Sequence, residues 1–241
     1  MFTANIVTSH QTGIHNNLEQ VVRRHQENLF RKPVAEHTRR AFEPVQHLVS
    51  QQNLPVILDS GCGTALSTRH IARQNPDALV IGIDRSAIRL GKDYQAALPD
   101  NALTVRADLV DFWNLAVQAG WKLQHHFILY PNPYPKSVHL KRRWHAHPVF
   151  PQLLKLGGQL ELRTNWSIYA EEFAFALRLS GYAAARVEAF MPENCWTLFE
   201  TKYYQTGQDL YRCRVQLSCH PNDSCSNGAD KPDIFTTPVQ T

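Results

Sequence analysis

From Pro55 onward, short apolar segments alternate with longer segments that have the residue spacing of helices, and this alternation constrains the fold more than any other feature. Strands that alternate with helices are typical of a largely parallel sheet whose two faces are both covered by helices. We therefore predict an α/β fold. The expected strands are 56–58, 78–83, 103–105, 126–130, 159–164, 182–190 and 209–217, and the expected helices are 64–75, 86–97, 110–120, 139–155 and 167–180.

Three regions of the chain differ in composition. Residues 1–50 carry apolar residues near helical spacing among many charged ones, so we expect an N-terminal helical extension. Their cations are offset by acids, which leaves open whether this region is a solvated helical face or an element that covers a site. Residues 51–218 are expected to form the main domain. Residues 219–241 are rich in Ser, Asn, Asp, Pro and Gly and are expected to be a disordered tail.

Composition limits the class of partner and the compartment. The 241 residues are 43% hydrophobic, which suffices for one sizeable core, and the formal net charge of +4 permits a nucleic-acid partner without requiring one. The five cysteines are an odd number without the spacing of a disulfide framework, so we expect a reducing, cytoplasmic setting. We expect no signal peptide, since no charged leader precedes an apolar stretch, and no membrane partner. A monomer is expected.

A glycine turn follows the first predicted strand and precedes a helix. In the sequence Asp59-Ser60-Gly61-Cys62-Gly63, the glycines allow the backbone to pass close to a ligand, and the start of the helix offers free amide donors. This is not the dinucleotide-binding pattern, because Leu66 stands where that pattern has its third glycine. We interpret Cys62 as a small packing residue of the turn.

Acids stand at the ends of the first three predicted strands. We expect the Asp59 carboxylate to accept hydrogen bonds from a ligand ammonium group, and Asp84 to hold the two hydroxyl groups of a ribose. Asp108 is placed to hold an adenine amino group, although capping of the following helix is a serious alternative. A ligand with ammonium, ribose and adenine parts is S-adenosyl-L-methionine. The residues expected to bind this cofactor are Asp59, Gly61, Gly63, Asp84 and Asp108.

The fourth predicted strand, 126–130, ends at the sequence Pro131-Asn132-Pro133. Because proline cannot donate to a sheet ladder, the backbone leaves the sheet there, and Asn132 is placed at the carboxyl end of a strand. Open α/β sheets bind their ligands at that edge. A cation-rich segment without acids follows; it favours contact with nucleic-acid phosphates, although a solvated helix end would have the same composition. This segment contains Lys136, His139, Lys141, Arg142, Arg143, Trp144, His145 and His147.

These motifs together resemble the class I methyltransferases and, more narrowly, the bacterial tRNA (guanine-N7)-methyltransferase family. Residues 131–136 match the family motif Pro-Asp-Pro-Trp-His-Lys. The His and the Lys-Arg-Arg that follow this motif in the family are matched by His139 and by 141–143. The Gly-Gly strand that ends in Thr-Asp is matched by 157–165, and Thr-Lys-Phe-Glu is matched by 201–204. The resemblance implies a Rossmann-like, seven-stranded, mostly parallel sheet, tRNA as the partner and no metal.

The resemblance also implies roles for individual residues. Asn132 would be the catalytic residue that orients the target base, and the substrate-binding residues would be Lys136, Asn165, Thr201 and Tyr204. The residues implied to contact RNA are His139, Lys141, Arg142 and Arg143. Three acids of the family pattern are replaced, by Asn132, Asn165 and Tyr204, so the chain is expected to be a divergent member.

The expected reaction is methylation of guanine N7 in tRNA, which needs no general base because N7 is an unprotonated acceptor. Two alternatives stay open. Asn132-Pro133-Tyr134 resembles, one proline short, the Asn-Pro-Pro-Tyr motif of amino-directed methyltransferases, in which the Asn carbonyl holds an adenine or glutamine NH₂ group. The loss of three acids also fits a non-catalytic paralogue that binds cofactor or RNA.

Four aromatic residues have two possible roles each. Tyr134 and Trp144 either stack on bases or pack in the interior. Tyr203 and Tyr204 either line the acceptor pocket or begin the last strand pair.

Overall fold

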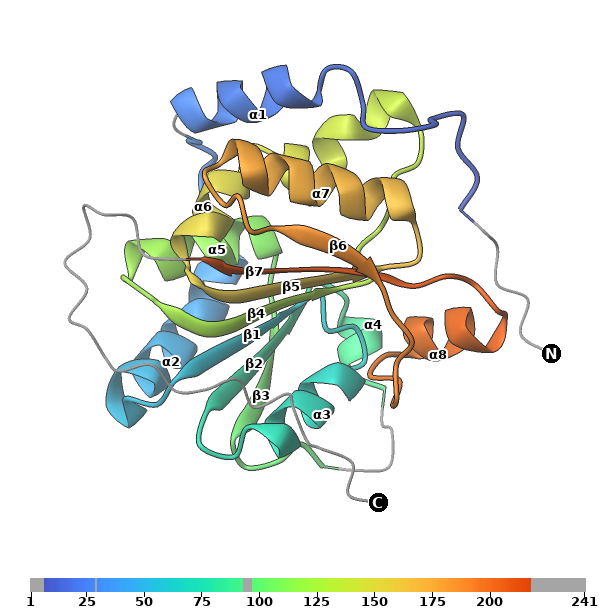
Figure 1. Ribbon diagram of the computed structural model, residues 1–241. Coiled ribbons are helices and arrows are strands. Elements are labelled where there is room, and N and C mark those ends of the chain that lie inside the picture. The colour runs from blue at the N-terminus through green and yellow to red at the C-terminus, as the bar shows by residue number, and fades with distance from the viewer. Residues whose placement is uncertain (1–6, 29, 93–96, 218–241) are drawn as a thin grey trace.

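A seven-stranded sheet in the order β3-β2-β1-β4-β5-β7-β6 runs through the computed structural model, which describes residues 7–28, 30–92 and 97–217 (Figure 1). The strands are β1 Val56–Ser60, β2 Leu79–Asp84, β3 Ala102–Arg106, β4 Leu123–Leu129, β5 Gly158–Thr164, β6 Arg186–Ala189 and β7 Tyr211–Leu217. Strands β1 to β5 are parallel, and β7 is antiparallel to both of its neighbours, β5 and β6. The predicted mostly parallel, seven-stranded α/β sheet is therefore confirmed.

Helices cover both faces of this sheet (Figure 1). On one face lie α5, α6 and α7, with α1 packed on α7 and α2 packed on α5, whereas α3 and α8 lie on the other face. The helices are α1 Leu18–Glu27, α2 Glu36–Gln52, α3 Leu66–Gln74, α4 Ala87–Leu90, α5 Leu109–Gln118, α6 Phe150–Lys155, α7 Ser167–Leu179 and α8 Leu198–Gln205. Two short 3₁₀ helices, η1 Ser137–Arg142 and η2 Trp144–Ala146, follow β4.

The central strands are apolar on both sides because each side meets a layer of helices. In β1, Val56 and Leu58 belong to the apolar cluster shared with α5, α6 and α7, and Ile57 belongs to the cluster shared with α3. This alternation follows from the period of two residues in a strand. It explains why the predicted strands 56–58 and 78–83 are continuous apolar runs.

The two N-terminal helices pack into the core of the molecule. Leu18 and Val22 of α1 and Phe42 and Val45 of α2 belong to the same buried cluster as the strands. Helix α2 continues to Gln52, directly before β1. The division of the chain at residue 50 therefore stays a proposal, and the tail expected at 219–241 lies outside the described residues.

The largest departure from the predicted elements lies after β4. The single helix expected over 139–155 is instead divided into η1, η2 and α6. Pro148 interrupts the segment, and a second proline, Pro151, lies in the first turn of α6, where helices tolerate it. The tyrosines Tyr203 and Tyr204 lie in α8, a helix that was not predicted, and do not begin a strand. The helix expected over 86–97 is described only as the short α4, and residues 93–96 lie outside the described part.

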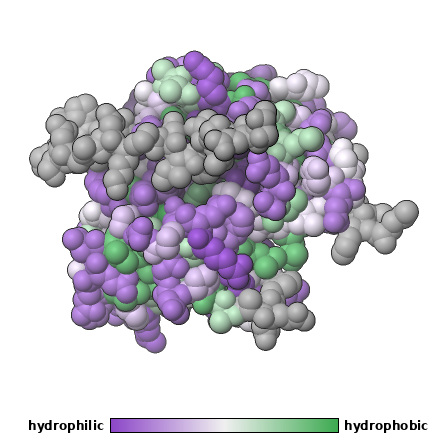
Figure 2. All heavy atoms as spheres, turned by 60° about the horizontal axis from the view of Figure 1, so that its bottom comes forward, coloured by the Kyte–Doolittle hydropathy of each residue, from purple (hydrophilic) through white to green (hydrophobic). Residues whose placement is uncertain are grey.

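Hydrophilic residues cover much of the face shown in Figure 2, with hydrophobic patches between them. Within the described ranges, no helix has both the length and the apolar character needed to cross a membrane.

Candidate active site

The chain order reverses between the adjacent central strands β1 and β4, since β2 and β3 lie on one side of β1 and the later strands lie on the other. Open α/β sheets form a ligand crevice outside the carboxyl ends of the strands at such a point. A cavity of about 1060 Å³ opens there. Its walls are the glycine turn, the residues after β2 and β3, the loop after β4, and α8.

The glycine turn has the backbone conformation that the sequence predicts. Gly61 has φ +86° and Gly63 has φ +59°, in the left-handed region that side chains with a Cβ disfavour. The backbone N–H groups of Gly61 and Cys62 donate to the Ile83 carbonyl, which ties the turn to the neighbouring strand. A Cβ placed on either glycine would meet no heavy atom within 4 Å, so the space beside the turn is open to a ligand.

Asp84 lies at the end of β2 on the cavity wall, and its carboxylate is already oriented by the surrounding chain. Its Oδ2 accepts from the Gly63 N–H at 3.0 Å, and its Oδ1 accepts from the Ser86 N–H at 2.8 Å and from Arg89 Nη2 at 2.9 Å. The Gly63 donor belongs to the glycine turn after β1, and the Ser86 donor lies two residues after Asp84 itself. Asp84 therefore presents a fixed carboxylate edge, which suits a ligand with paired hydroxyl groups.

Asp108 caps the following helix and also lines the cavity, so its role toward adenine stays a prediction. Its Oδ1 accepts from the N–H groups of Val110 at 3.0 Å and Asp111 at 3.3 Å, so it caps the amino end of α5. It also lines the cavity and remains partly exposed, with Lys32 Nζ 3.8 Å from Oδ1. Capping thus fixes the side chain on the wall without withdrawing it from the cavity.

Asp59 lies elsewhere than expected. It is 1% exposed and is not among the described residues that line the cavity. Its Oδ2 accepts from the hydroxyl groups of Ser67 at 2.6 Å and Thr68 at 2.7 Å in the first turn of α3, and burial raises its pKa to about 6. The expected direct contact with a ligand ammonium group is not supported by this arrangement, because the carboxylate holds the start of α3.

The loop after β4 is the acceptor loop, residues 130–135, and two of its residues have strained backbone. Tyr130 has φ +51° and Tyr134 has φ +45°, both unusual for residues other than glycine. Asn132 between them is exposed, lines the cavity, and accepts from the Tyr134 N–H through Oδ1 at 3.2 Å. Its side-chain carbonyl is thus engaged within the loop.

Arg143, which was predicted to contact RNA, is instead buried at 0% exposure, and this prediction is wrong for the described conformation. Its Nε and Nη2 donate to the Tyr134 carbonyl at 3.2 Å and 3.1 Å, and its Nη1 pairs with Glu172 of α7. The guanidinium lies over the Trp166 ring, 4.9 Å from its centroid. Arg143 therefore holds the acceptor loop in place from inside the protein.

Glu172 connects this arginine to the N-terminal segment. It also accepts from His145 Nε2 at 2.9 Å, from the His15 N–H at 2.9 Å, and from Gln11 Nε2 at 2.5 Å. Burial alone would raise the pKa of this carboxyl, but hydrogen bonds and charge from His145 and Arg143 lower it to about 2. Glu172 therefore stays ionised in the interior.

Helix α8 is tied to the same loop by a second buried carboxylate, Glu200. Its Oε1 accepts from the Tyr130 hydroxyl at 2.9 Å and from Arg163 Nη1 at 3.0 Å, and its Oε2 accepts from the Trp196 N–H at 2.6 Å. Arg163 also donates to Glu161 at 2.6 Å and lies 3.7 Å from the Trp196 ring centroid. Neither Glu200 nor Arg163 was predicted, because the sequence does not show that these charged residues meet each other and Tyr130 in the interior.

The other predicted substrate and RNA residues divide into two groups. Thr201 and Arg142 line the cavity, and the Arg142 guanidinium lies 5.8 Å from the centroid of the Tyr134 ring. Asn165 instead donates to Gln208 Oε1 at 2.9 Å. Within the described ranges, the predicted residues that do not line the cavity are Lys136, His139, Lys141, Asn165 and Tyr204, so their roles stay predictions. The lining residues that were not predicted include Arg85, Arg89, Lys92, Lys202 and Phe199.

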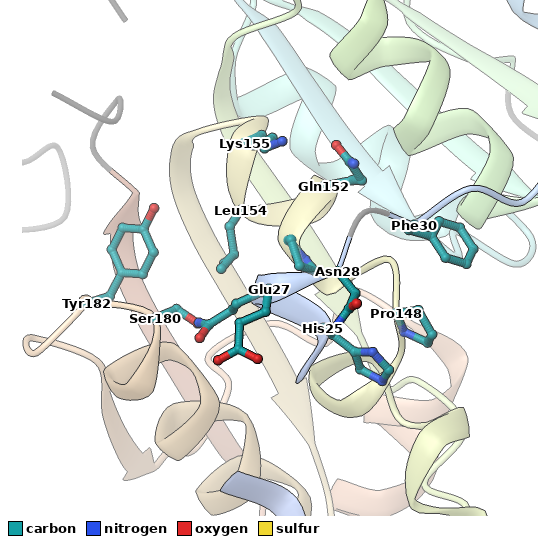
Figure 3. A pocket seen from close by; sticks show the side chains of 12 residues that line it. His25, Glu27, Asn28, Phe30, Pro148, Gln152, Leu154, Lys155, Ser180 and Tyr182 are labelled. Carbon is teal, nitrogen blue, oxygen red and sulfur yellow. The ribbon is translucent and has the colours of Figure 1, made fainter. Parts of the chain in front are cut away.

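A second, smaller cavity of about 440 Å³ shares no lining residue with the first (Figure 3). It lies among the ends of α1 and α7 and the helix α6, with His25, Glu27 and Lys155 on its walls. Helices α6 and α7 lead into β5 and β6, so this cavity lies toward the amino ends of the strands and away from the predicted site. Among the residues described, no group of three His, Cys, Asp or Glu side chains is placed to hold a metal.

A family model described as "Putative methyltransferase" matches residues 53–213, which include β1 to β6, the start of β7 and all described residues that line the large cavity. The chain belongs to this family. A tRNA (guanine-N(7)-)-methyltransferase of Neisseria meningitidis serogroup C is 32% identical over 171 residues, covering 66% of this chain and 70% of the relative. The enzyme of the same name from Xylella fastidiosa (strain M12) is 29% identical over 170 residues, covering 66% of this chain and 68% of the relative.

Solved structures agree on the fold. The 16S rRNA methyltransferase KamB superposes with a TM-score of 0.56 at 17% identity, covering 78% of this chain and 95% of that one. The predicted class I methyltransferase fold and the resemblance to the tRNA (guanine-N7)-methyltransferases, as a divergent member, are confirmed. S-adenosylmethionine is the cofactor of this methyltransferase, and the open glycine turn with Asp84 and Asp108 fits its polar parts.

Proposed function

We propose that this methyltransferase forms 7-methylguanosine in tRNA. The names of the relatives, at 29% and 32% identity over two thirds of the chain, support this substrate. The structural observation that carries the proposal is the orientation of Asn132. Its Oδ1 accepts from the Tyr134 N–H, and in the described part of the chain nothing accepts from its Nδ2 amide. The Nδ2 amide therefore provides a free hydrogen-bond donor for a substrate.

A donor at Asn132 matches guanine better than adenine. On its major-groove edge guanine presents two acceptors, N7 and O6, whereas adenine carries an amino donor in place of O6. Asn132 Nδ2 donating to O6 would orient the base and leave the N7 lone pair free. The amino-directed alternative needs the Asn132 carbonyl to accept from a target NH₂ group, and one of the two lone pairs of that carbonyl is already engaged by the Tyr134 N–H.

The protein has few chemical tasks in this reaction. The bound cofactor supplies an electrophilic methyl group, and N7 carries no proton to remove. The chain must therefore bind the base, align N7 within about 3–3.5 Å of the methyl carbon and exclude water. Asn132 supplies orientation but no negative charge, so we expect a slower enzyme than one with a carboxylate at this position.

Cations around the cavity provide a surface for tRNA phosphates. Arg85, Lys92 and Arg142 are exposed and line the mouth, and Lys202 of α8 is half-buried beside them. Lys136 and Lys141 are exposed outside the cavity and extend the same basic surface. Binding through these groups would weaken steeply with salt, because each phosphate contact releases counterions.

The test is methyl transfer from labelled cofactor to tRNA by the purified protein, followed by nucleoside analysis. We expect 7-methylguanosine, and we expect no product from a transcript in which 7-deazaguanosine replaces guanosine. Methyl groups on an exocyclic nitrogen would support the amino-directed alternative instead. Cofactor binding in calorimetry without transfer to any tRNA would support a non-catalytic paralogue.

A further inference from the structure

The amino-terminal turn of α8 presents an apolar aromatic ring to the large cavity. Phe199 is 50% exposed and lines the cavity, beside Leu198 at 47%. Large apolar side chains that are exposed in a cavity commonly mark a contact surface for a ligand. Neither side chain belongs to the buried clusters that hold the sheet to its helices.

This ring is supported from behind by two other aromatic side chains. The Phe199 and Tyr203 rings are stacked, with centroids 6.1 Å apart and an interplanar angle of 23°. Tyr203 in turn lies 5.6 Å from the ring of Tyr130, the first residue of the acceptor loop. A row of three rings thus leads from the end of β4 to the cavity wall.

The turn that carries Phe199 is also held rigidly. Thr197 caps α8 by accepting from the Glu200 N–H at 2.9 Å, and the buried Glu200 carboxylate binds Tyr130 and Arg163. Tyr130 lies two residues before Asn132, so one carboxylate connects α8 to the acceptor loop. The exposure of Phe199 is therefore a property of a fixed surface and not of a loose segment.

We propose that Phe199 is the stacking wall of the acceptor subsite, on which the ring of the target guanine lies while Asn132 contacts its edge. The proposal rests on the proposed function and names a substrate contact within it. Guanine N7 in an A-form helix lies in a deep, narrow groove that side chains cannot reach, so the base must leave its stack and enter the cavity. An extruded base needs an apolar surface in place of its lost neighbours, and stacking on an aromatic side chain provides it.

The charges around the ring fit this occupant. Lys202 lies on the same helix and lines the same cavity, and Arg142 lines the wall formed by the segment after the acceptor loop. Aromatic rings interleaved with cations are typical of surfaces that bind single-stranded nucleic acid. The glycine turn with Asp84 and Asp108 forms a separate wall of the cavity. Phe199 is therefore assigned to the acceptor and not to the cofactor.

The test compares Phe199→Ala, Phe199→Leu and Phe199→Tyr with a matched control, Met191→Ala. Met191 is 80% exposed, precedes α8 and does not line the cavity. We measure kcat and KM for tRNA, and the Kd of S-adenosylhomocysteine by calorimetry. For Phe199→Ala we expect kcat/KM to fall about 10- to 100-fold, the loss typical of one stacked base. Phe199→Tyr should retain most of the activity, Phe199→Leu should be intermediate, and the Kd should not change.

Two results would overturn the assignment. One is a Phe199→Ala variant as active as Met191→Ala. The other is a variant whose loss appears mainly in the Kd of S-adenosylhomocysteine, which would place the ring beside the cofactor. The product formed by the wild-type protein tests the proposed function separately. If the methyl group is found at an atom other than N7, the proposed function fails. The Phe199→Ala variant still reports whether the base that is methylated stacks on α8.

Discussion

The two walls of the cavity are constructed differently. The carboxylates of the cofactor wall are held by backbone N–H groups, those of Gly63 and Ser86 for Asp84 and that of Val110 for Asp108. The acceptor wall depends on pairs of side chains far apart in the chain, such as Tyr130 with Glu200. A wall held by backbone groups tolerates side-chain replacement at the donor positions, whereas a wall held by pairs of side chains changes when either partner is replaced.

The replaced family acids fall on the acceptor side of this division. Asn132 lines the cavity, whereas Asn165 and Tyr204 lie near it without lining it among the described residues. The acids of the cofactor wall, Asp84 and Asp108, are present. Divergence from the family pattern has thus affected the side of the site on which we propose that the base binds, and the predictions below test whether the two walls respond independently.

The largest effect is expected from Arg143→Met. The variant removes the contact to the Tyr134 carbonyl and leaves the Glu172 carboxylate buried without its main partner. Breaking a buried pair in this way typically costs about 3–5 kcal/mol of folding free energy. Urea unfolding should show this loss, and Arg142→Met, an exposed neighbour of the same charge, should show almost none. Equal stability of the two variants would contradict the structural role of Arg143.

Asn132→Ala should leave stability and cofactor affinity unchanged while slowing transfer. Losing one preorganised hydrogen-bond partner of the reacting group typically lowers a rate by roughly 10²–10³. Single-turnover transfer to tRNA measures this step directly. The matched control is Asn165→Ala, whose amide binds Gln208 and does not line the cavity. A similar loss in both variants would mean that Asn132 has no special place on the acceptor wall.

The buried Asp59, which holds the start of α3 next to the glycine turn, predicts a pH dependence of stability. Its folded pKa of about 6 lies above the ordinary value of 3.8, so between these values the folded state holds a proton that the unfolded chain has released. Stability should therefore fall as pH rises through that window, by about 3 kcal/mol in total. Urea unfolding between pH 4 and 7 should show a flatter profile for Asp59→Asn than for the wild type. An unchanged profile would mean that the carboxyl is not buried in solution.

Asp84→Asn is expected to have the smallest effect and to act on the cofactor wall alone. Hydrogen bonds to a charged group contribute about 1.5–3 kcal/mol, so the Kd of S-adenosylhomocysteine should rise about 10- to 100-fold. Affinity for tRNA should not change in filter binding. Asp77→Asn, an exposed acid before β2, is the control. A loss of tRNA affinity in Asp84→Asn would show that the two walls are coupled.

The contrast between the walls also explains which features the sequence could predict. The strand and helix alternation, the glycine turn and Asn132 at a strand end follow from local patterns, and the structure has them where they were expected. Arg142 and Arg143 are chemically the same residue in sequence, and only the packing of Glu172 from α7 makes one of them interior. Helix α8 was not predicted, and the sequence does not show that its Glu200 binds the Tyr130 hydroxyl or that its Phe199 lies beside the same loop.

The contacts of Glu172 extend to a stretch that the family model does not cover. Gln11 and the His15 backbone donate to this carboxylate, and Ser9 donates to the Pro135 carbonyl in the acceptor loop at 2.8 Å. The family match begins at residue 53. Alignments limited to the matched region therefore omit residues that contact the acceptor loop, and exchanging residues 9–15 between relatives should change how this loop is held.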